Sequence, residues 1–305
     1  MKAGIVGLPN VGKSTLFNCL SNAKAQSANF PFCTIEPNIG VVNVPDKRLD
    51  VLADLVNTEK VIPATVEIVD IAGLVKGASK GEGLGNKFLG NIRETDAILH
   101  VLRCFEDDNI VHVDGSVDPL RDKETIDIEL QLKDLESTEK RRDKILRAAK
   151  TGNKEAQKEL GVLDQIIAAL KAAQNVRSIY FSYEDRINYV NTLQLITDKP
   201  VMYICNVSED AALDGNHFVN QIKEAVVTEK AQVLVLAVSI EADINELDSY
   251  EERQLFLEDI GLDEPGSAKL IRSAYHLLSL QTYFTAGEKE VRAWTVKKGA
   301  TASQA

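Results

Sequence analysis

The chain has 305 residues, 44% hydrophobic and 27% charged, and a formal net charge of −11 at pH 7. This length predicts about two domains and a sizeable buried core, while the negative charge argues against sequence-specific DNA binding or a surface that coats nucleic acid, leaving only local basic patches. The four cysteines are scattered without a C-x-x-C pair, which argues against a disulfide framework or a zinc site and favours a reducing, cytoplasmic location.

A phosphate-binding loop follows the first predicted strand. Residues 7–14 read Gly-Leu-Pro-Asn-Val-Gly-Lys-Ser and match G-x-x-x-x-G-K-[ST]. The apolar run 3–6 precedes this loop, and apolar residues at helical spacing follow it. Backbone N–H groups and the helix N-terminus at such a turn bind a polyphosphate. We therefore expect Lys13 to contact the β- and γ-phosphates and assist catalysis, Ser14 to bind Mg²⁺, and the loop to bind nucleotide through Asn10, Val11, Gly12, Lys13, Ser14 and Thr15.

Two further segments supply the predicted metal side of the site. Residues 66–73 form an apolar strand that ends in Asp-x-x-Gly, so Asp70 is expected to hold Mg²⁺ through water and the Gly73 N–H to contact the γ-phosphate. Thr34 lies where a first switch loop brings a second Mg²⁺ ligand, and residues 76–85 resemble a glycine-rich second switch. Cys33 is a candidate redox-sensitive thiol, although a buried structural thiol is the simpler interpretation.

Apolar runs that alternate with helical segments predict an α/β fold with a mostly parallel sheet covered on both faces. The runs are 4–6, 39–42, 64–69, 97–102, 201–205 and 233–238. The longest, 233–238, is far too short to span a bilayer, so no membrane association is expected. About a hundred residues separate the fourth run from the fifth, which is too many for a simple crossover.

The long gap between these two runs predicts an inserted helical hairpin of coiled-coil type. Apolar residues recur at helical spacing on both sides of Gly152, namely Ile128, Leu132 and Leu135 before it and Leu163, Ile166, Ile167 and Leu170 after it. Two antiparallel helices with a turn near Gly152 account for this pattern. The segment 140–158 is rich in Lys and Arg. Such a run is typical of a solvated helical face, but at the tip of a projecting hairpin it favours an acidic partner such as RNA.

The C-terminal part differs from the rest. Residues 267–280 have helical spacing, and 283–287 and 291–296 read as two strands. About thirty residues cannot bury a core alone, so these strands are expected to begin a further domain that is incomplete here. The predicted division is a nucleotide-binding domain over 1–124 and 197–279, the hairpin over 125–196, and the start of the last domain over 280–305.

These motifs together resemble the Obg-like, YchF-type ATPases within the Obg-related translation-factor class of P-loop proteins. The resemblance rests on the strings 7–15, 29–38, 70–78 and 206–209, and residues 280–287 resemble the start of that family's β-grasp-like TGS domain. It implies a GTPase-like fold and Mg²⁺ as cofactor. It also implies a ribosome or ribosomal RNA partner, reached through the hairpin and the TGS region.

The base-reading motif departs from that of ordinary GTPases. Their Asn-Lys-x-Asp is replaced by Asn206-Val207-Ser208-Glu209, which lacks the lysine and carries a longer acid. A misplaced buried acceptor facing the base costs about 1 kcal/mol or more. The resemblance therefore implies ATP preference, with Asn206 recognising adenine and Val207 lining the base pocket. Ser239, after the run 233–238, lies where the last base-contacting loop is expected.

The position that carries a water-orienting glutamine in Ras-like enzymes is Leu74, which can neither donate nor accept a hydrogen bond. The resemblance implies that a histidine from a nearby loop replaces it, and the matching residue is His112 in the segment 105–113. Without the resemblance, a lone histidine is more often structural. The competing histidines are His100 in a predicted buried strand and His217 and His276 in later helical segments.

Three functions remain open from the sequence. The first is an ATPase of low intrinsic turnover whose nucleotide state switches binding to the ribosome or another large partner. The second is a non-catalytic, nucleotide-gated adaptor, which Leu74 keeps open. The third, a conventional GTPase, is disfavoured by the residues at 206–209.

Overall fold

The computed structural model describes residues 1–22, 39–71, 84–113, 115–229 and 231–304. Four of the positions singled out above, Cys33, Thr34, Gly73 and Leu74, lie outside the described residues, as does most of the segment 76–85. Among the described residues, no helix combines the length and the apolar character that crossing a bilayer requires.

The main sheet of the described chain has the strand order β2-β4-β1-β5-β6-β7. Its strands are β1 Lys2–Val6, β2 Ile39–Asn43, β4 Thr65–Asp70, β5 Ala97–Arg103, β6 Val201–Asn206 and β7 Gln232–Leu236. Only β2 runs antiparallel, against β4. Every residue of β5 and β6 is buried, as expected for central parallel strands covered on both faces. The predicted α/β fold with a mostly parallel sheet is confirmed.

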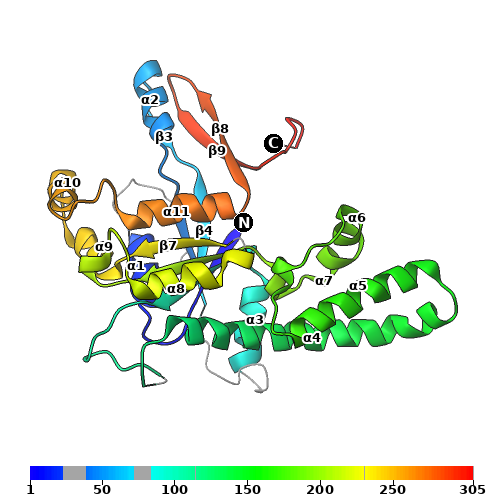
Figure 1. The fold of residues 1–305 in the computed structure, drawn as a ribbon. Helices are drawn as coiled ribbons and strands as arrows, with labels where there is room; N and C mark the ends of the chain where they lie inside the picture. The colour runs from blue at the N-terminus through cyan, green and yellow to red at the C-terminus, as the bar shows by residue number, and fades with distance from the viewer. Residues whose placement is uncertain (23–38, 72–83, 114, 230, 305) are drawn as a thin grey trace.

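Helices cover both faces of this sheet (Figure 1). Helix α11 packs on β5, β6 and β7, while α4 contacts β5 and α8 contacts β7 on the other side. Helix α1 follows β1 and packs against α9. The bounds of the helices around the sheet are α1 Lys13–Asn22, α2 Lys47–Val56, α3 Leu84–Arg93, α8 His217–Ala225, α9 Val238–Glu246, α10 Tyr250–Asp259 and α11 Gly266–Leu277.

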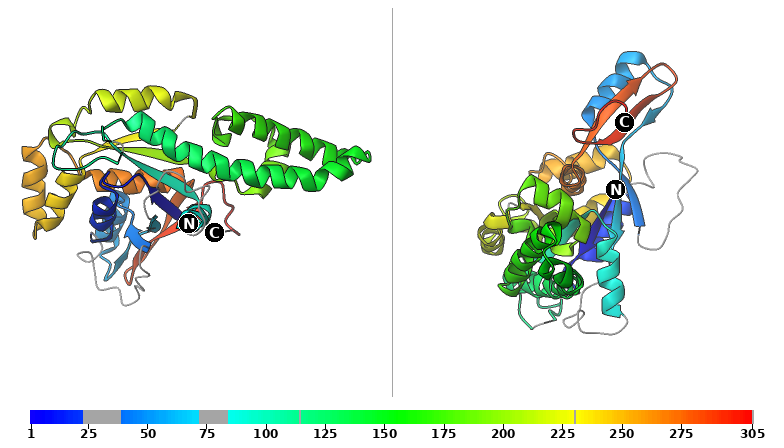
Figure 2. Two further views of the ribbon diagram at one scale, coloured as in Figure 1. Left: turned by 90° about the horizontal axis from the view of Figure 1, so that it is seen from below. Right: turned by 90° about the vertical axis from the view of Figure 1, so that its right-hand side faces the viewer.

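The predicted hairpin consists of α4 Pro119–Lys150 and α5 Lys154–Lys171, which pack against each other and project beyond the sheet (Figure 2). Asp118 and Asn153 cap the two helices by accepting hydrogen bonds from Arg121 N and Ala156 N. Gly152 occupies the turn with φ 92°, a conformation that favours glycine. Short helical turns lead back to β6: η1 Val176–Ser178, α6 Tyr183–Asp185, η2 Arg186–Val190, α7 Asn191–Leu193 and η3 Ile196–Asp198.

The buried face of α4 is not the apolar stripe that indicated the helix. Ile128 and Leu132 are 48% and 38% exposed, whereas Asp127 and Asp134 are buried. The prediction of a helix is therefore correct, but the spacing of these apolar residues does not identify the face of the helix that is buried. The reason is a set of polar partners from residues 175–229 that α4 turns toward, which no periodic pattern reveals.

The C-terminal strands are both present. Strand β8 Leu280–Ala286 pairs antiparallel with β9 Val291–Lys297, and β9 also pairs in parallel with the short β3 Val61–Ile62. The two strands thus form a three-stranded sheet with a segment from the first quarter of the chain, close to α2. The sequence pattern did not reveal this pairing.

Candidate nucleotide-binding site

The phosphate-binding loop lies between β1 and α1, as predicted, and its backbone is tightly enclosed. Gly12 has φ +90°, and a Cβ there would lie 2.5 Å from Nδ2 of Asn206. A side chain at this position would therefore collide with the base-side motif as well as strain the backbone. Leu16 N donates to Gly12 O at 2.9 Å, so the first turn of α1 starts directly from the loop.

The predicted cation and the predicted acidic residue meet at the carboxyl ends of β1 and β4. Lys13 is buried and its Nζ forms an ion pair with Oδ1 of Asp70. Ser14 and Thr15 are exposed in the first turn of α1, beside this pair. A hydroxyl and a carboxylate are hard oxygen donors of the kind that Mg²⁺ prefers, so the described residues fit the expected metal. The other two proposed contacts, Thr34 and Gly73, lie outside the described residues.

Asn206 braces the base side of the site. Its Nδ2 donates to Val11 O and its Oδ1 accepts from Val238 N, both at 3.0 Å. The side chain therefore ties the phosphate loop to the start of α9, and it is 4% exposed. The predicted strand 233–238 is corrected here, because β7 ends at Leu236 and Val238 already begins the helix. The sequence assigned Asn206 to the base and missed this bracing role. The only available signal was an asparagine at the end of a buried strand.

The neighbouring base-side residues occupy different environments. Val207 is buried, and its N donates to Leu236 O at 3.0 Å. Glu209 is exposed in the short turn η4 Glu209–Ala211. Ser239 is exposed in the first turn of α9, next to the residue that Asn206 holds. The structure therefore brings Gly12, Asn206 and the α9 start together, with Ser239 at their edge.

His112 lies in the loop after β5, and this loop contacts the phosphate loop. The Nδ2 of Asn10 donates to Val111 O at 3.1 Å. The imidazole itself is buried, and its Nε2 donates to Oδ2 of Asp122 at 2.9 Å. Burial raises the pKa of Asp122, and the hydrogen bond from His112 only partly opposes that shift. The sequence did not predict this carboxylate.

The other histidines lie in a buried strand and in later helices, as predicted. His100 is buried in β5, where burial lowers its pKa to about 4 and keeps it neutral near pH 7. His217 begins α8 and His276 lies in the last turn of α11, and both are exposed. Among the four histidines, His112 is the one that lies in a loop, and the neighbouring Val111 O accepts a hydrogen bond from Asn10 of the phosphate loop.

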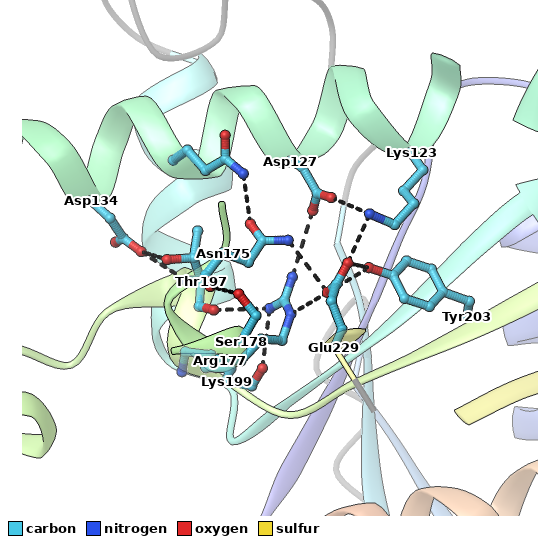
Figure 3. A network of polar contacts seen from close by, with 11 residues as sticks. Lys123, Asp127, Asp134, Asn175, Arg177, Ser178, Thr197, Lys199, Tyr203 and Glu229 are labelled. Atoms are coloured by element: carbon cyan, nitrogen blue, oxygen red, sulfur yellow. Dashed lines mark hydrogen bonds and ion pairs between the residues drawn. The ribbon is translucent and has the colours of Figure 1, made fainter. Parts of the chain in front are cut away.

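A buried polar network fastens α4 to the sheet (Figure 3). Nζ of Lys123 lies 2.7 Å from Asp127 and 2.9 Å from Glu229, and Nε of Arg177 lies 2.7 Å from Glu229. The Tyr203 hydroxyl donates to Glu229 at 3.1 Å. Burial alone would raise the pKa of Glu229, but the charges of Arg177 and Lys123 outweigh it and hold that pKa at about 2. The two cations and two carboxylates therefore compensate one another, as burial of charge requires.

A second anchor lies further along α4. Asp134 is fully buried and accepts from Ile196 N at 3.0 Å and from Thr197 N and Oγ1 at 2.7 Å. The root of the hairpin is thus attached to the sheet domain at two points.

The strand–loop–helix unit with Lys13, the acidic residue at the end of β4 and the asparagine after β6 define a P-loop nucleotide-binding protein of the GTPase-like class. A family model described as 50S ribosome-binding GTPase matches residues 2–150, and a second, described as a protein of unknown function, matches residues 280–305. The chain belongs to the YchF family, as its resemblance predicts, and the following relatives show this.

Curated relatives named ribosome-binding ATPase YchF align over the whole chain. Those from Haemophilus ducreyi and Bacillus subtilis are 55% and 53% identical, and each alignment covers 100% of this chain and 83% of the relative. A solved structure described as the Schizosaccharomyces pombe YchF GTPase has a TM-score of 0.88 and 36% identity, covering 100% of this chain and 82% of that one.

Proposed function

We propose that the chain is a Mg²⁺-dependent ATPase of low intrinsic turnover whose nucleotide state switches its binding to the ribosome. The observation that carries this proposal is the joint placement of Lys13, Asp70 and Asn206 around one phosphate loop. The bacterial relatives are named ribosome-binding ATPases, which supports ATP as the nucleotide and the ribosome as the partner. A ribosome partner implies a cytoplasmic location, and the domain division proposed from the sequence separates a nucleotide part from a partner-binding hairpin.

The choice between ATP and GTP is a real question for this family. The bacterial relatives are named ATPases, whereas the fission yeast structure is described as a GTPase. In this chain, Val207 is buried where guanine-reading proteins carry lysine, and the Glu209 side chain is exposed. The two features that favour guanine are therefore missing, which supports ATP, with Asn206, Val207 and Ser239 on the base side.

We expect ATP to bind at least roughly tenfold more tightly than GTP, because a site without the guanine-pairing carboxylate gains nothing from guanine's N1–H and amino group. Competition of unlabelled ATP and GTP against one labelled nucleotide measures this ratio. The variant Val207→Lys with Glu209→Asp should move the preference toward GTP, while Glu209→Gln, which keeps the side-chain length, should not. Equal or tighter GTP binding by the parent chain would contradict the proposal.

Mg²⁺ would be held by the hydroxyls of Ser14 and Thr34 and, through water, by Asp70. When bound, the ion neutralises charge on the β- and γ-phosphates. Lys13 adds a second positive charge to the same cradle, and the backbone of residues 10–15 surrounds the phosphates. His112 is the proposed water-positioning group, and Gly73 the proposed γ-phosphate contact.

The hairpin is the proposed contact to ribosomal RNA, together with the region of β8 and β9. Three consecutive basic side chains are paired with acids of the hairpin itself, Lys140 with Glu136, Arg141 with Glu159 and Arg142 with Asp164. Four exposed basic residues nearer the turn form no ion pair within the described part of the chain: Lys144, Arg147, Lys150 and Lys154. We call these four residues the tip cations.

Changing the tip cations to glutamate should weaken ribosome binding at least roughly tenfold at physiological salt, because contacts to RNA phosphates are lost. Each lost contact should also reduce the slope of log affinity against log salt by about 0.7 to 0.9. Sedimentation with ribosomes over a range of salt concentrations measures both quantities. A control with Lys144, Lys150 and Lys154 changed to arginine keeps the charge and should bind normally. Unchanged affinity and salt slope in the glutamate variant would remove the tip from the interface, and ATP affinity should stay the same in both variants.

A second candidate function is a nucleotide-gated adaptor that does not depend on hydrolysis. It is favoured by the engagement of His112 with Asp122, because that histidine would then be structural. Single-turnover hydrolysis distinguishes the two functions, since the adaptor has the same rate with and without His112.

A further inference from the structure

The hydrogen bond between His112 and Asp122 keeps the proposed water-positioning residue from binding a water molecule through Nε2. The imidazole is only 4% exposed, and its Nε2 is bonded to the carboxylate at 2.9 Å. A group that orients an attacking water must present a ring nitrogen within hydrogen-bond reach of that water. In this arrangement Nε2 has another partner, and the ring is covered by protein.

Asp122 belongs to an immobile part of the molecule. It lies in the first turn of α4, directly before Lys123, whose ammonium group pairs with Asp127 and Glu229. Arg177 completes the cluster through Glu229 (Figure 3). Moving this end of α4 would separate buried charges from their partners, which is strongly unfavourable. The carboxylate is therefore a fixed point.

The loop that carries His112 buries little apolar surface beside the histidine. Val111 and Val113 on either side of His112 are 76% and 54% exposed, so displacing them loses little apolar burial. The guanidinium of Arg103 donates to the carbonyls of Asp107 and Ile110, which fixes the start of the loop. Arg121 donates to Ser116, which fixes the end of the loop, and between these points His112 is bonded to Asp122 and Asn10 to Val111 O.

We propose that Asp122 is a positioning residue that holds His112 in an inactive conformation. The hydrogen bond between them must break before His112 acts on the attacking water. The inference rests on the proposed role of His112 in hydrolysis. The loop is the moving part, and α4 is the fixed one. Because Asn10 of the phosphate loop holds the neighbouring Val111, a shift of the phosphate loop is transmitted directly to His112.

In the alternative interpretation, the Asp122 carboxylate orients an imidazole that is already in its active position. The two interpretations predict opposite effects of removing the carboxylate on the rate of hydrolysis. Removing a carboxylate that orients the active imidazole makes hydrolysis slower, whereas removing one that holds the imidazole inactive makes hydrolysis faster. A hydrogen bond to a charged group shifts a conformational equilibrium by roughly tenfold or more, which sets the size of the gain.

The test is single-turnover hydrolysis with saturating ATP and Mg²⁺. Asp122→Ala should hydrolyse about tenfold faster than the parent at unchanged ATP affinity, and the gain should vanish when His112→Ala is added. A gain that vanishes with His112→Ala acts through the histidine and not through another part of the site. A rate equal to or below that of the parent would overturn the proposal.

Two further variants keep the test decisive. Asp118→Ala removes the cap of the same helix without touching His112, and it should hydrolyse at the parent rate. An equal gain in that variant would assign the effect to fraying of α4 and overturn the proposal. If Asp122→Ala does not fold, Asp122→Asn retains the shape and should still be about threefold faster, and an unchanged or slower rate counts against the proposal. If His112→Ala itself hydrolyses at the parent rate, the proposed role of His112 in hydrolysis fails. A slow His112→Ala with no gain from Asp122→Ala contradicts the inference about Asp122 alone.

Discussion

Replacing Lys13 by alanine is expected to weaken ATP binding by roughly a hundredfold or more. The ammonium group is the cation that the phosphate loop offers to the β- and γ-phosphates, and charge-assisted hydrogen bonds to phosphate are among the strongest polar contacts in proteins. The change has a second cost. Asp70 loses the partner with which it is ion-paired, and its uncompensated carboxylate then faces the incoming phosphates.

Equilibrium titration with a fluorescent ATP analogue measures the loss in Lys13→Ala. The matched control is Lys2→Ala, since Lys2 begins β1, the strand that leads into the phosphate loop, and pairs with Glu67 at 3.8 Å on the surface. That control should bind ATP like the parent. ATP affinity that survives the loss of Lys13 would mean that this loop is not the nucleotide site, and it would overturn the proposed function as a whole.

Replacing His112 by alanine is expected to slow hydrolysis roughly a hundredfold, which is the usual contribution of a positioned acid–base group. ATP affinity should be nearly unchanged, because the imidazole is bonded to Asp122 and is not part of the phosphate cradle. Single-turnover hydrolysis at saturating ATP isolates this effect from binding and product release.

His217→Ala is the matched control for His112→Ala. His217 is exposed at the first position of α8, so its loss should leave both hydrolysis and ATP affinity at the parent values. If His112→Ala hydrolyses at the parent rate, the histidine is structural and the adaptor function gains the support that the ATPase loses.

Each local motif predicted one part of the site, and the parallel sheet brings these parts together from distant positions in the sequence. The phosphate loop, the acid that ends β4 and the asparagine that ends β6 each follow a buried strand, and parallel strands bring their carboxyl ends to one edge of the sheet. The closeness of Lys13 to Asp70 follows from this geometry, whereas the hydrogen bonds by which Asn206 holds the loop were not predicted.

What the sequence could not show is where polar residues are buried. Asp127 and Asp134 on α4 look like surface residues of a charged helix, yet each is buried against partners far along the chain. The apolar Ile128 and Leu132, which indicated the helix, are exposed instead. Periodicity reports which residues are apolar, and it carries no information on carboxylates that are compensated by a distant Arg177 or Thr197.

The insertion between β5 and β6 has a consequence for the order in which the molecule is made. These strands are hydrogen-bonded neighbours, with Leu99 beside Met202, but about a hundred residues separate them in sequence. Synthesis of that stretch takes roughly 5 to 20 seconds at usual rates of about 5–20 residues per second. During that interval β5, which is mostly apolar and is buried in the finished fold, is an open sheet edge, the kind of surface on which nascent chains aggregate. The contacts between α4 and α5 are local and form quickly. Formation of the hairpin thus brings the two ends of the gap together. The phosphate loop, at residues 7–14, is held by Asn206 only after the whole insertion has been synthesised.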